Sequence, residues 1–194
     1  MQDITPRIID YRLNPAHKDI LIPKQIKLNG MTLFDFQRDS VDKFIKTKRG
    51  ILKLPTGAGK TFTAVAIFKT LSIPTLWLTH RTSLMYQTAK VFSERIPDIR
   101  QRIGIIGDSQ YNPNFLTIAT TQSIRSAIKK HPEEMKHQLG QYQMVIVDEA
   151  HRMGAKSFFE SVSFCQGAYY RLALTATPFM RNDPYENFTL TGAM

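Results

Sequence analysis

The residues with the clearest chemical pattern lie at Leu54–Thr61, which read LPTGAGKT. They follow the apolar run GILKL and precede an apolar stretch with helical periodicity, which is the context of a phosphate-binding loop. Gly57 and Gly59 would let the backbone approach phosphate oxygens, and the helix N-terminus would add unpaired N–H groups. Lys60 would reach the β- and γ-phosphates, and Thr61 would ligate Mg²⁺. The segment therefore predicts a nucleoside-triphosphate site, although the strict form of the loop begins with glycine and this one with leucine.

An acidic pair ends a second apolar run in MVIVDEAHR, residues 144–152. Four apolar residues place Asp148 at the carboxyl end of a buried strand, where ligand sites form in open α/β sheets. Asp148 would hold the same Mg²⁺ as Thr61, and Glu149 would orient or deprotonate an attacking water. His151 is either a hydrogen-bonded surface histidine or a relay between the nucleotide and neighbouring elements. Coupled to the phosphate loop, this pair predicts a magnesium-dependent nucleotide site.

The elements that must position these residues follow from the alternation of short apolar runs with longer amphipathic stretches. Strands are predicted at Gly50–Leu54, Thr75–Thr79, Arg102–Ile106, Leu116–Thr120, Met144–Val147 and Arg171–Leu174. Helices are predicted at Lys60–Leu71, Ser83–Arg95, Gln122–Lys129, Pro132–Leu139 and Ala155–Phe164. A further helix is predicted from Thr32, which forms a capping-box pattern with Asp35. Strands that are apolar throughout and separated by helices indicate an α/β sandwich with a mostly parallel central sheet.

Composition excludes several classes of protein. The 194 residues contain one cysteine, Cys165, which excludes an internal disulfide framework and a cysteine-rich zinc site. No apolar run approaches the roughly 18 residues that cross a bilayer, and the first ten residues lack the pattern of a secretory signal. We therefore expect an intracellular protein, cytoplasmic if its source is prokaryotic or a phage. The formal net charge of +10 lies mostly in residues 1–100 and favours phosphate-rich partners.

Together, LPTGAGKT and VDEAH resemble the superfamily 2 helicases and translocases of the DEAH-box type, in which the first position of the phosphate loop is not strictly glycine. Gln37 in LFDFQ is similar to the adenine motif of this family, with Phe34 standing where arginine is usual. Residues 76–87 resemble motif Ia, residues 118–124 motif Ib and residues 174–183 motif III. The His-Arg pair of motif Ia and the form of motif III look closest to the DNA-handling branch of XPB-, RecG- and UvsW-type enzymes.

This resemblance implies a RecA-like P-loop NTPase lobe with ATP and Mg²⁺ as cofactors. Lys60, Asp148, Glu149 and His151 would be catalytic, and Thr61 and Asp148 would bind the metal. The nucleotide would be held by Phe36, Gln37, Pro55, Thr56, Gly57, Ala58, Gly59, Lys60 and Thr61, with Gln37 reading the adenine edge. Coupling between the nucleotide and nucleic-acid sites would fall to Thr175, Ala176 and Thr177.

Motifs Ia and Ib would grip nucleic acid through Arg81, Thr82, Thr121, Gln122 and Ser123. Arginine, hydroxyl and amide groups and helix N-termini are the usual contacts to a nucleic-acid backbone. Such binding is expected to tolerate any sequence and to weaken steeply with salt. Thr82 and Thr121 each precede a predicted helix, so helix capping is an equally good interpretation of both.

We predict two regions in the chain. Residues 1–31 form an N-terminal extension of extended or β pieces, and residues 32–194 form the first RecA-like lobe. Members of the family need a second lobe that carries motifs IV to VI and an arginine that stabilises the transferring phosphoryl group. No such motif follows Asp183. We therefore expect this chain to hydrolyse almost no ATP alone, since losing an arginine finger can cost about 10³–10⁵ in turnover.

The leading hypothesis is the ATP-binding lobe of an ATP-dependent DNA helicase or translocase that acts on duplex or branched DNA. Three alternatives stay open: an RNA helicase lobe, the motor segment of a restriction enzyme, and a nucleic-acid-binding regulatory module without hydrolysis. DEAH sequences occur in both DNA and RNA helicases, so the acidic motif does not separate the first two hypotheses. Stimulation of ATP hydrolysis by duplex, branched or single-stranded DNA or by RNA would separate them.

Overall fold

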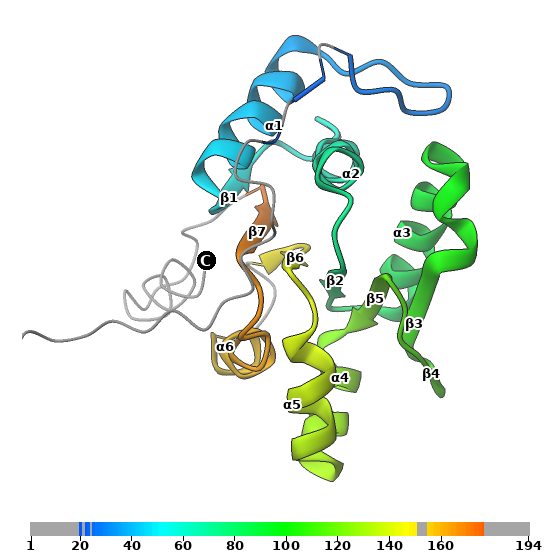
Figure 1. Cartoon of the computed structure of the whole chain (residues 1–194), viewed down its shortest axis with the longest axis vertical. Coiled ribbons are helices and arrows are strands. Elements are labelled where there is room, and N and C mark those ends of the chain that lie inside the picture. Colours follow the sequence, from blue (N-terminus) through cyan, green and yellow to red (C-terminus); the bar gives the residue numbers. More distant parts are fainter. Residues whose placement is uncertain (1–19, 21, 24, 151–154, 177–194) are drawn as a thin grey trace, which may run out of the picture.

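A single seven-stranded sheet forms the centre of the computed structural model, which describes residues 20, 22–23, 25–150 and 155–176, with the backbone alone for residues 155–158. Its strands are β1 (Arg49–Lys53), β2 (Thr75–Thr79), β3 (Ile103–Gly107), β4 (Gln110–Asn112), β5 (Leu116–Thr120), β6 (Met144–Val147) and β7 (Tyr170–Thr175). They lie in the order β1-β7-β6-β2-β5-β3-β4, and every pairing is parallel except that of β3 with β4 (Figure 1). The prediction of a mostly parallel sheet is confirmed.

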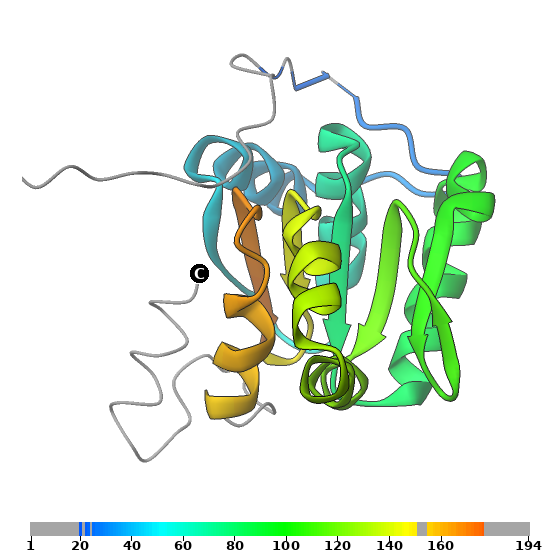
Figure 2. The same cartoon turned by 60° about the horizontal axis from the view of Figure 1, so that its bottom comes forward.

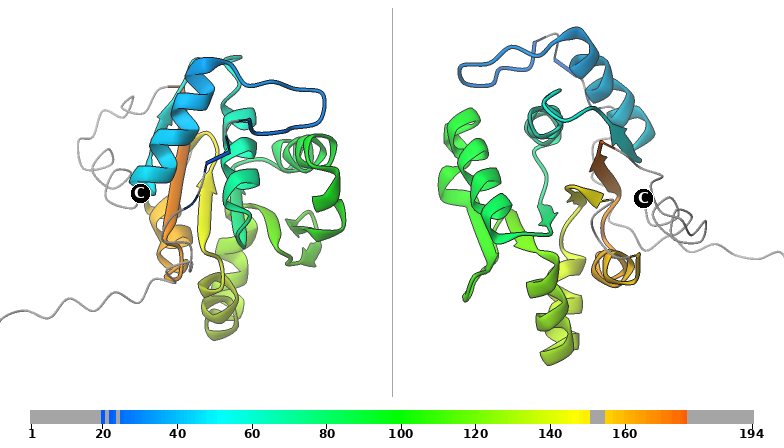
Figure 3. Two further views of the ribbon diagram at one scale, coloured as in Figure 1. Left: turned by 45° about the horizontal axis from the view of Figure 1, so that its top comes forward. Right: turned by 180° about the vertical axis from the view of Figure 1, so that it is seen from behind.

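Helices cover both faces of this sheet. They are α1 (Asp35–Thr47), α2 (Lys60–Leu71), α3 (Thr82–Arg95), α4 (Thr121–Lys130), α5 (Pro132–Gly140) and α6 (Ala155–Ser163), with a 3₁₀ turn at Pro97–Arg102. The first three helices pack on one face and the last three on the other, as Figures 2 and 3 show. Within the described ranges, no helix combines the length and apolarity needed to cross a membrane.

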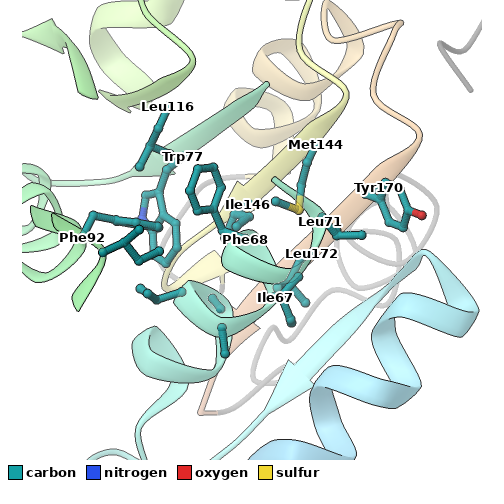
Figure 4. Close-up of a cluster of buried hydrophobic side chains, with 14 of the residues drawn as sticks. Ile67, Phe68, Leu71, Trp77, Phe92, Leu116, Met144, Ile146, Tyr170 and Leu172 are labelled. Atoms are coloured by element: carbon teal, nitrogen blue, oxygen red, sulfur yellow. The ribbon is translucent and has the colours of Figure 1, made fainter. Parts of the chain in front are cut away.

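Each face of the sheet has its own buried core, because alternate residues of a strand point to opposite faces. Trp77 of β2 packs edge-on against Phe92 of α3, with ring centroids 5.5 Å apart, and Phe68 of α2 packs against the same ring at 5.2 Å (Figure 4). On the other face, the β2 residues Leu76 and Leu78 join the second core. Burial on both sides applies to the central strands β2, β5 and β6, in which every residue is buried.

Three local details differ from the sequence-based predictions. The helix predicted from Thr32 begins at Asp35, so the proposed capping box is wrong, and the Gln37 Oε1 atom accepts the Phe34 N–H at 3.1 Å instead. Strand β4 was not predicted because its two-residue turn with β3, Asp108–Ser109, lacks the Asn-Gly signal of such turns. The 3₁₀ turn was also missed, since a proline after a helix indicates only that the helix ends.

The described part of the N-terminal region packs against the lobe. Ile26 and Leu28 are buried in the same core as α1, α2 and α3. The turn after Leu28 is fixed to the end of α3, since Asn29 N donates to the Arg95 carbonyl at 2.9 Å and the Arg95 Nη1 atom donates to the Asn29 carbonyl at 2.8 Å. This part of the extension therefore bridges α1 and α3 and adds no strand to the sheet.

Candidate functional site

The phosphate-loop candidate joins β1 to α2 and curls tightly because two glycines adopt positive φ. Gly57 has a φ of 83° and Gly59 a φ of 80°, values that L-residues with a side chain rarely adopt. A Cβ atom at Gly59 would also collide with the Gln37 Nε2 atom. Gly59 is the N-cap of α2, so the unpaired N–H groups of the first helical turn face the loop. This geometry is typical of a site that binds an anion.

Lys60 and Thr61 begin the helix at the floor of this loop. The Lys60 side chain is only 8% exposed, and its Nζ atom donates to the carbonyls of Leu54 at 3.1 Å and Pro55 at 3.4 Å. The ammonium group is thus held inside the curve of the loop by neutral acceptors. A phosphate oxygen would be a stronger partner for the same group because hydrogen bonds between two charged groups are shorter and stronger.

The adenine-motif glutamine is buried beside the loop. Gln37 is 1% exposed, and its Nε2 atom donates to the Ala58 carbonyl at 3.1 Å, while its Oε1 atom accepts the Phe34 N–H. Phe36, by contrast, is 44% exposed and stacks on Phe34 with ring centroids 5.8 Å apart. In this structure the Gln37 amide therefore fixes the phosphate loop to the start of α1. Its contact with adenine stays a prediction.

Asp148 and Glu149 follow β6 directly and face the phosphate loop. The Asp148 N–H donates to the Leu78 carbonyl at 2.9 Å, which holds the acidic residue at the end of the sheet. Burial, and then the negative charge of Glu149, raise the pKa of the Asp148 carboxyl to about 6. The Glu149 N–H, which donates to Asp148 Oδ1 at 2.9 Å, and the positive charge of Lys60 oppose this rise. A cation bound beside this carboxyl would favour its charged form and lower its pKa.

A single cavity of about 330 Å³ brings the phosphate-loop residues and the acidic pair together. Its lining includes Gly57, Lys60, Thr61, Asp148 and Glu149. Among the described residues, no three His, Cys, Asp or Glu side chains cluster as a metal site. One carboxylate and one hydroxyl suit Mg²⁺ carried by a nucleotide, because Mg²⁺ usually keeps water ligands and takes few from the protein. These residues therefore fit a magnesium nucleotide.

The end of β7 touches the start of the phosphate loop. Thr175 is fully buried and pairs in register with Lys53, and its carbonyl accepts the Leu54 N–H at 3.2 Å. The coupling candidate Thr175 thus contacts the first residue of the phosphate loop, and Ala176 is the next residue in the chain. Thr177 and His151 lie outside the described residues.

The five nucleic-acid candidates lie where the neighbouring strands β2 and β5 end. Arg81 and Thr82 are exposed at the start of α3, and Gln122 is exposed at the start of α4. The Thr121 hydroxyl is buried and donates to the Thr79 carbonyl at 3.0 Å, so it joins the two strand ends. Ser123 is half-buried in the first turn of α4. The structure brings all five to the carboxyl end of the parallel strands, the same end at which Asp148 follows β6.

The capping interpretation of Thr82 and Thr121 is wrong by one residue in each case. The N-cap of α3 is Arg81, with no capping bond from its side chain. The N-cap of α4 is Thr120, whose Oγ1 atom accepts the Ser123 N–H at 3.2 Å. Sequence patterns alone locate a helix end only to within a residue or two.

Sequence reasoning also missed the helix that forms the far wall of the nucleotide cavity. Leu84, Gln87, Thr88 and Val91 of α3 line it. Their spacing of three, four and seven residues marks one helical face, and that spacing could have been found in the sequence.

Comparison with known proteins assigns the chain to a family. A family model described as "Type III restriction enzyme, res subunit" matches residues 30–180. A protein of Sulfurisphaera tokodaii named "DNA 3'-5' translocase XPB2" is 29% identical over 170 residues, which are 87% of this chain and 36% of that protein. The chain thus spans about a third of the length of this relative.

Two solved structures share the fold. The crystal structure of the UvsW helicase from bacteriophage T4 has a TM-score of 0.69 at 20% identity and covers 86% of this chain and 61% of its own. The Sulfolobus solfataricus SWI2/SNF2 ATPase core in complex with double-stranded DNA also has a TM-score of 0.69, at 17% identity, covering 91% of this chain and 38% of its own. At these identities the likeness shows the fold alone.

Proposed function

Because the chain belongs to the type III restriction enzyme res-subunit family, as the first RecA-like lobe of a superfamily 2 helicase, we propose that it is the ATP-binding lobe of an ATP-dependent DNA helicase or translocase. The observation that carries this proposal is the shared cavity in which Lys60, Thr61, Asp148 and Glu149 meet. Residues 148–151 read DEAH, and we include that subtype in the proposal.

We assign a separate role to the phosphate-loop residues and to each residue of the acidic pair. Lys60 and the N–H groups around Gly57 and Gly59 bind the phosphates, and Thr61 and Asp148 hold the metal. When bound there, Mg²⁺ would offset negative charge on the phosphates. Glu149 accepts a proton from the attacking water or orients it. A cation held by Asp148 would also offset the cost of burying its charge.

The second part of the proposal concerns the nucleic acid. Arg81, Thr82, Gln122 and Ser123 face one edge and carry the donors that bind phosphate oxygens without reading bases. A net charge of +10 favours the same polyanion. The relative named as a DNA translocase supports DNA over RNA as the substrate. Since the chain spans 36% of XPB2, we also propose that a second RecA-like lobe completes the motor.

Magnesium-dependent binding of ATP to the 194-residue chain, measured by isothermal titration calorimetry, tests the nucleotide site. Lys60→Ala is expected to weaken binding at least about tenfold, because it removes a charge-assisted contact worth roughly 1.5–3 kcal/mol. Lys69→Ala, in the last turn of the same helix, is the matched control and is expected to bind ATP normally. Equal affinity of the Lys60→Ala chain and the unaltered chain would refute the assignment.

A further inference from the structure

A second cavity lies further along the edge of the sheet that carries the nucleic-acid candidates. It opens between the β3–β4 hairpin and the helices α4 and α5, at the end of the sheet that Figure 1 shows with β4 outermost. Its volume is about 420 Å³, within the range of sites that hold small organic groups. Its apolar lining comes from Ile106, Tyr111 and Met135, and its polar lining includes Ser123, Lys130 and Glu134.

The hairpin wall of this cavity is held in place by hydrogen bonds. The Tyr86 hydroxyl, on α3, donates to the Asp108 Oδ2 atom at 2.8 Å, and the Gln110 Nε2 atom donates to the Tyr86 hydroxyl at 2.7 Å. Tyr86 stands one helical turn after Thr82, so the same helix carries a backbone-contact candidate and the anchor of the hairpin. The cavity is therefore formed by fixed elements, as binding sites usually are.

The cavity is continuous with the proposed nucleic-acid edge. Ser123 belongs to both, since it lies in the first turn of α4 and lines the cavity. A Cβ atom at Gly107, the last residue of β3, would lie 3.3 Å from the Ser123 Oγ atom, so β3 and α4 approach closely here. A strand whose backbone crosses the starts of α3 and α4 would therefore pass the mouth of this cavity.

The charges and shapes in the cavity favour a nucleobase over a phosphate. Lys130 and Glu134 bring opposite charges, so the cavity does not concentrate the positive charge that a phosphate prefers. The Tyr111 hydroxyl donates to the Met135 sulfur at 3.4 Å. The Tyr111 residue is nevertheless 48% exposed, so much of its surface is accessible to a ligand. An aromatic ring stacks on the flat face of any base, and a carboxylate accepts hydrogen bonds from exocyclic amino groups.

We propose that this cavity receives one unstacked base of a single nucleic-acid strand, with Tyr111 as the aromatic surface on which the base lies. This inference rests on the proposed function and narrows its substrate. A base can enter only where the strand is unpaired, so the lobe would grip a single-stranded region, as branched DNA provides. The backbone contacts would remain independent of sequence.

Binding of fluorescein-labelled 12-nucleotide strands to the 194-residue chain, followed by fluorescence anisotropy, tests this site. Tyr111→Ala is expected to weaken binding of a normal single strand about five- to a hundredfold, the usual effect of losing a stacking residue. The same substitution should not change the affinity for an abasic strand of equal length or for a blunt duplex. Tyr111→Phe should bind normally, because the ring remains. Phe159→Ala is the matched control, since Phe159 is a 52% exposed aromatic residue on α6.

The outcomes separate this inference from the proposed function. Equal losses on normal and abasic strands, or no loss on either, would overturn the base cavity while leaving a salt-dependent backbone interface intact. Failure of the unaltered chain to bind any strand would overturn both the base cavity and the proposed nucleic-acid interface, while ATP binding would still test the nucleotide site separately. Tyr111→Leu, which keeps apolar volume, gives the same test if the alanine variant does not fold. A Tyr111 dependence seen only with an oligoribonucleotide would support the cavity and replace DNA by RNA as its ligand.

Discussion

Replacement of Asp148 by asparagine is expected to stabilise the chain in the absence of nucleotide and metal. Asp148 is buried, and its pKa rises from the ordinary 3.8 to about 6. Between these two pH values the folded chain keeps a proton that the unfolded chain has lost, so the free energy of unfolding falls as the pH rises. A pKa higher by about 2 corresponds to about 3 kcal/mol, lost in full above about pH 7. Asparagine removes the charge and retains an oxygen for the Glu149 N–H.

Urea unfolding followed by circular dichroism measures this effect at pH 7.5 and pH 4. The Asp148→Asn chain should exceed the unaltered chain by about 2–3 kcal/mol at pH 7.5 and by well under 1 kcal/mol at pH 4. Asp39→Asn, an exposed position on α1, is the control and should change the stability by less than about 0.5 kcal/mol at either pH. The electrostatic reasoning would be refuted if the Asp148→Asn chain were less stable than the unaltered chain at pH 7.5. It would also be refuted if the difference in the free energy of unfolding were the same at both pH values.

The Asp148→Asn variant also tests whether the buried charge of Asp148 binds the cation. Saturating Mg²⁺ and ATP at a hundred times the dissociation constant should stabilise the unaltered chain by about 2.7 kcal/mol. The Asp148→Asn chain should gain less at the same concentrations, because a metal ligand is lost. An identical gain in both chains would mean that Asp148 does not hold the cation.

Two further predictions concern hydrolysis and nucleic-acid binding. In a motor that contains this lobe, Glu149→Gln should retain binding of Mg²⁺ and ATP but lower turnover about 10²–10⁴-fold, and single-turnover hydrolysis at the unaltered rate would contradict its role as the base. Arg81→Ala should weaken strand binding for all sequences and lower the salt slope by about 1, with ATP affinity unchanged. Lys90→Ala is the control, because Lys90 is an exposed cation further along α3. An altered sequence preference in Arg81→Ala would show that Arg81 reads bases.

The fold was largely predictable from the sequence because the central strands β2, β5 and β6 are buried on both faces. A run such as Met144–Val147 has no polar position, which separates it clearly from the amphipathic helices beside it. The outermost strand of the sheet, β4, was harder to predict. Residues 110–112 are all exposed and form a three-residue strand held by one antiparallel neighbour, so they carry neither an apolar run nor an alternating pattern.

The meeting of the phosphate-loop segment with Asp148 in one cavity was predictable for a related reason, since both follow parallel strands whose carboxyl ends lie at the same end of the sheet. The second role of Gln37 was not predictable. The hydrogen bond from the Gln37 Nε2 atom to the Ala58 carbonyl joins residues that are 21 positions apart in the sequence. Only the packing of α1 beside α2 brings these two residues together. The Tyr86–Asp108 bond is non-local in the same way, linking residues 22 positions apart.

The carboxyl-terminal end of β2 connects the two proposed sites through two backbone carbonyls. The Leu78 carbonyl accepts the Asp148 N–H at 2.9 Å, and the next carbonyl, that of Thr79, accepts the Thr121 hydroxyl at 3.0 Å. Since β2 lies between β6 and β5 in the sheet, an acidic residue of the nucleotide cavity and a residue at the start of α4 rest on consecutive peptide units. A displacement of Asp148 toward a bound cation would therefore pull on the strand end that also supports α4. This arrangement gives the lobe a short, hydrogen-bonded connection between the proposed nucleotide and nucleic-acid sites.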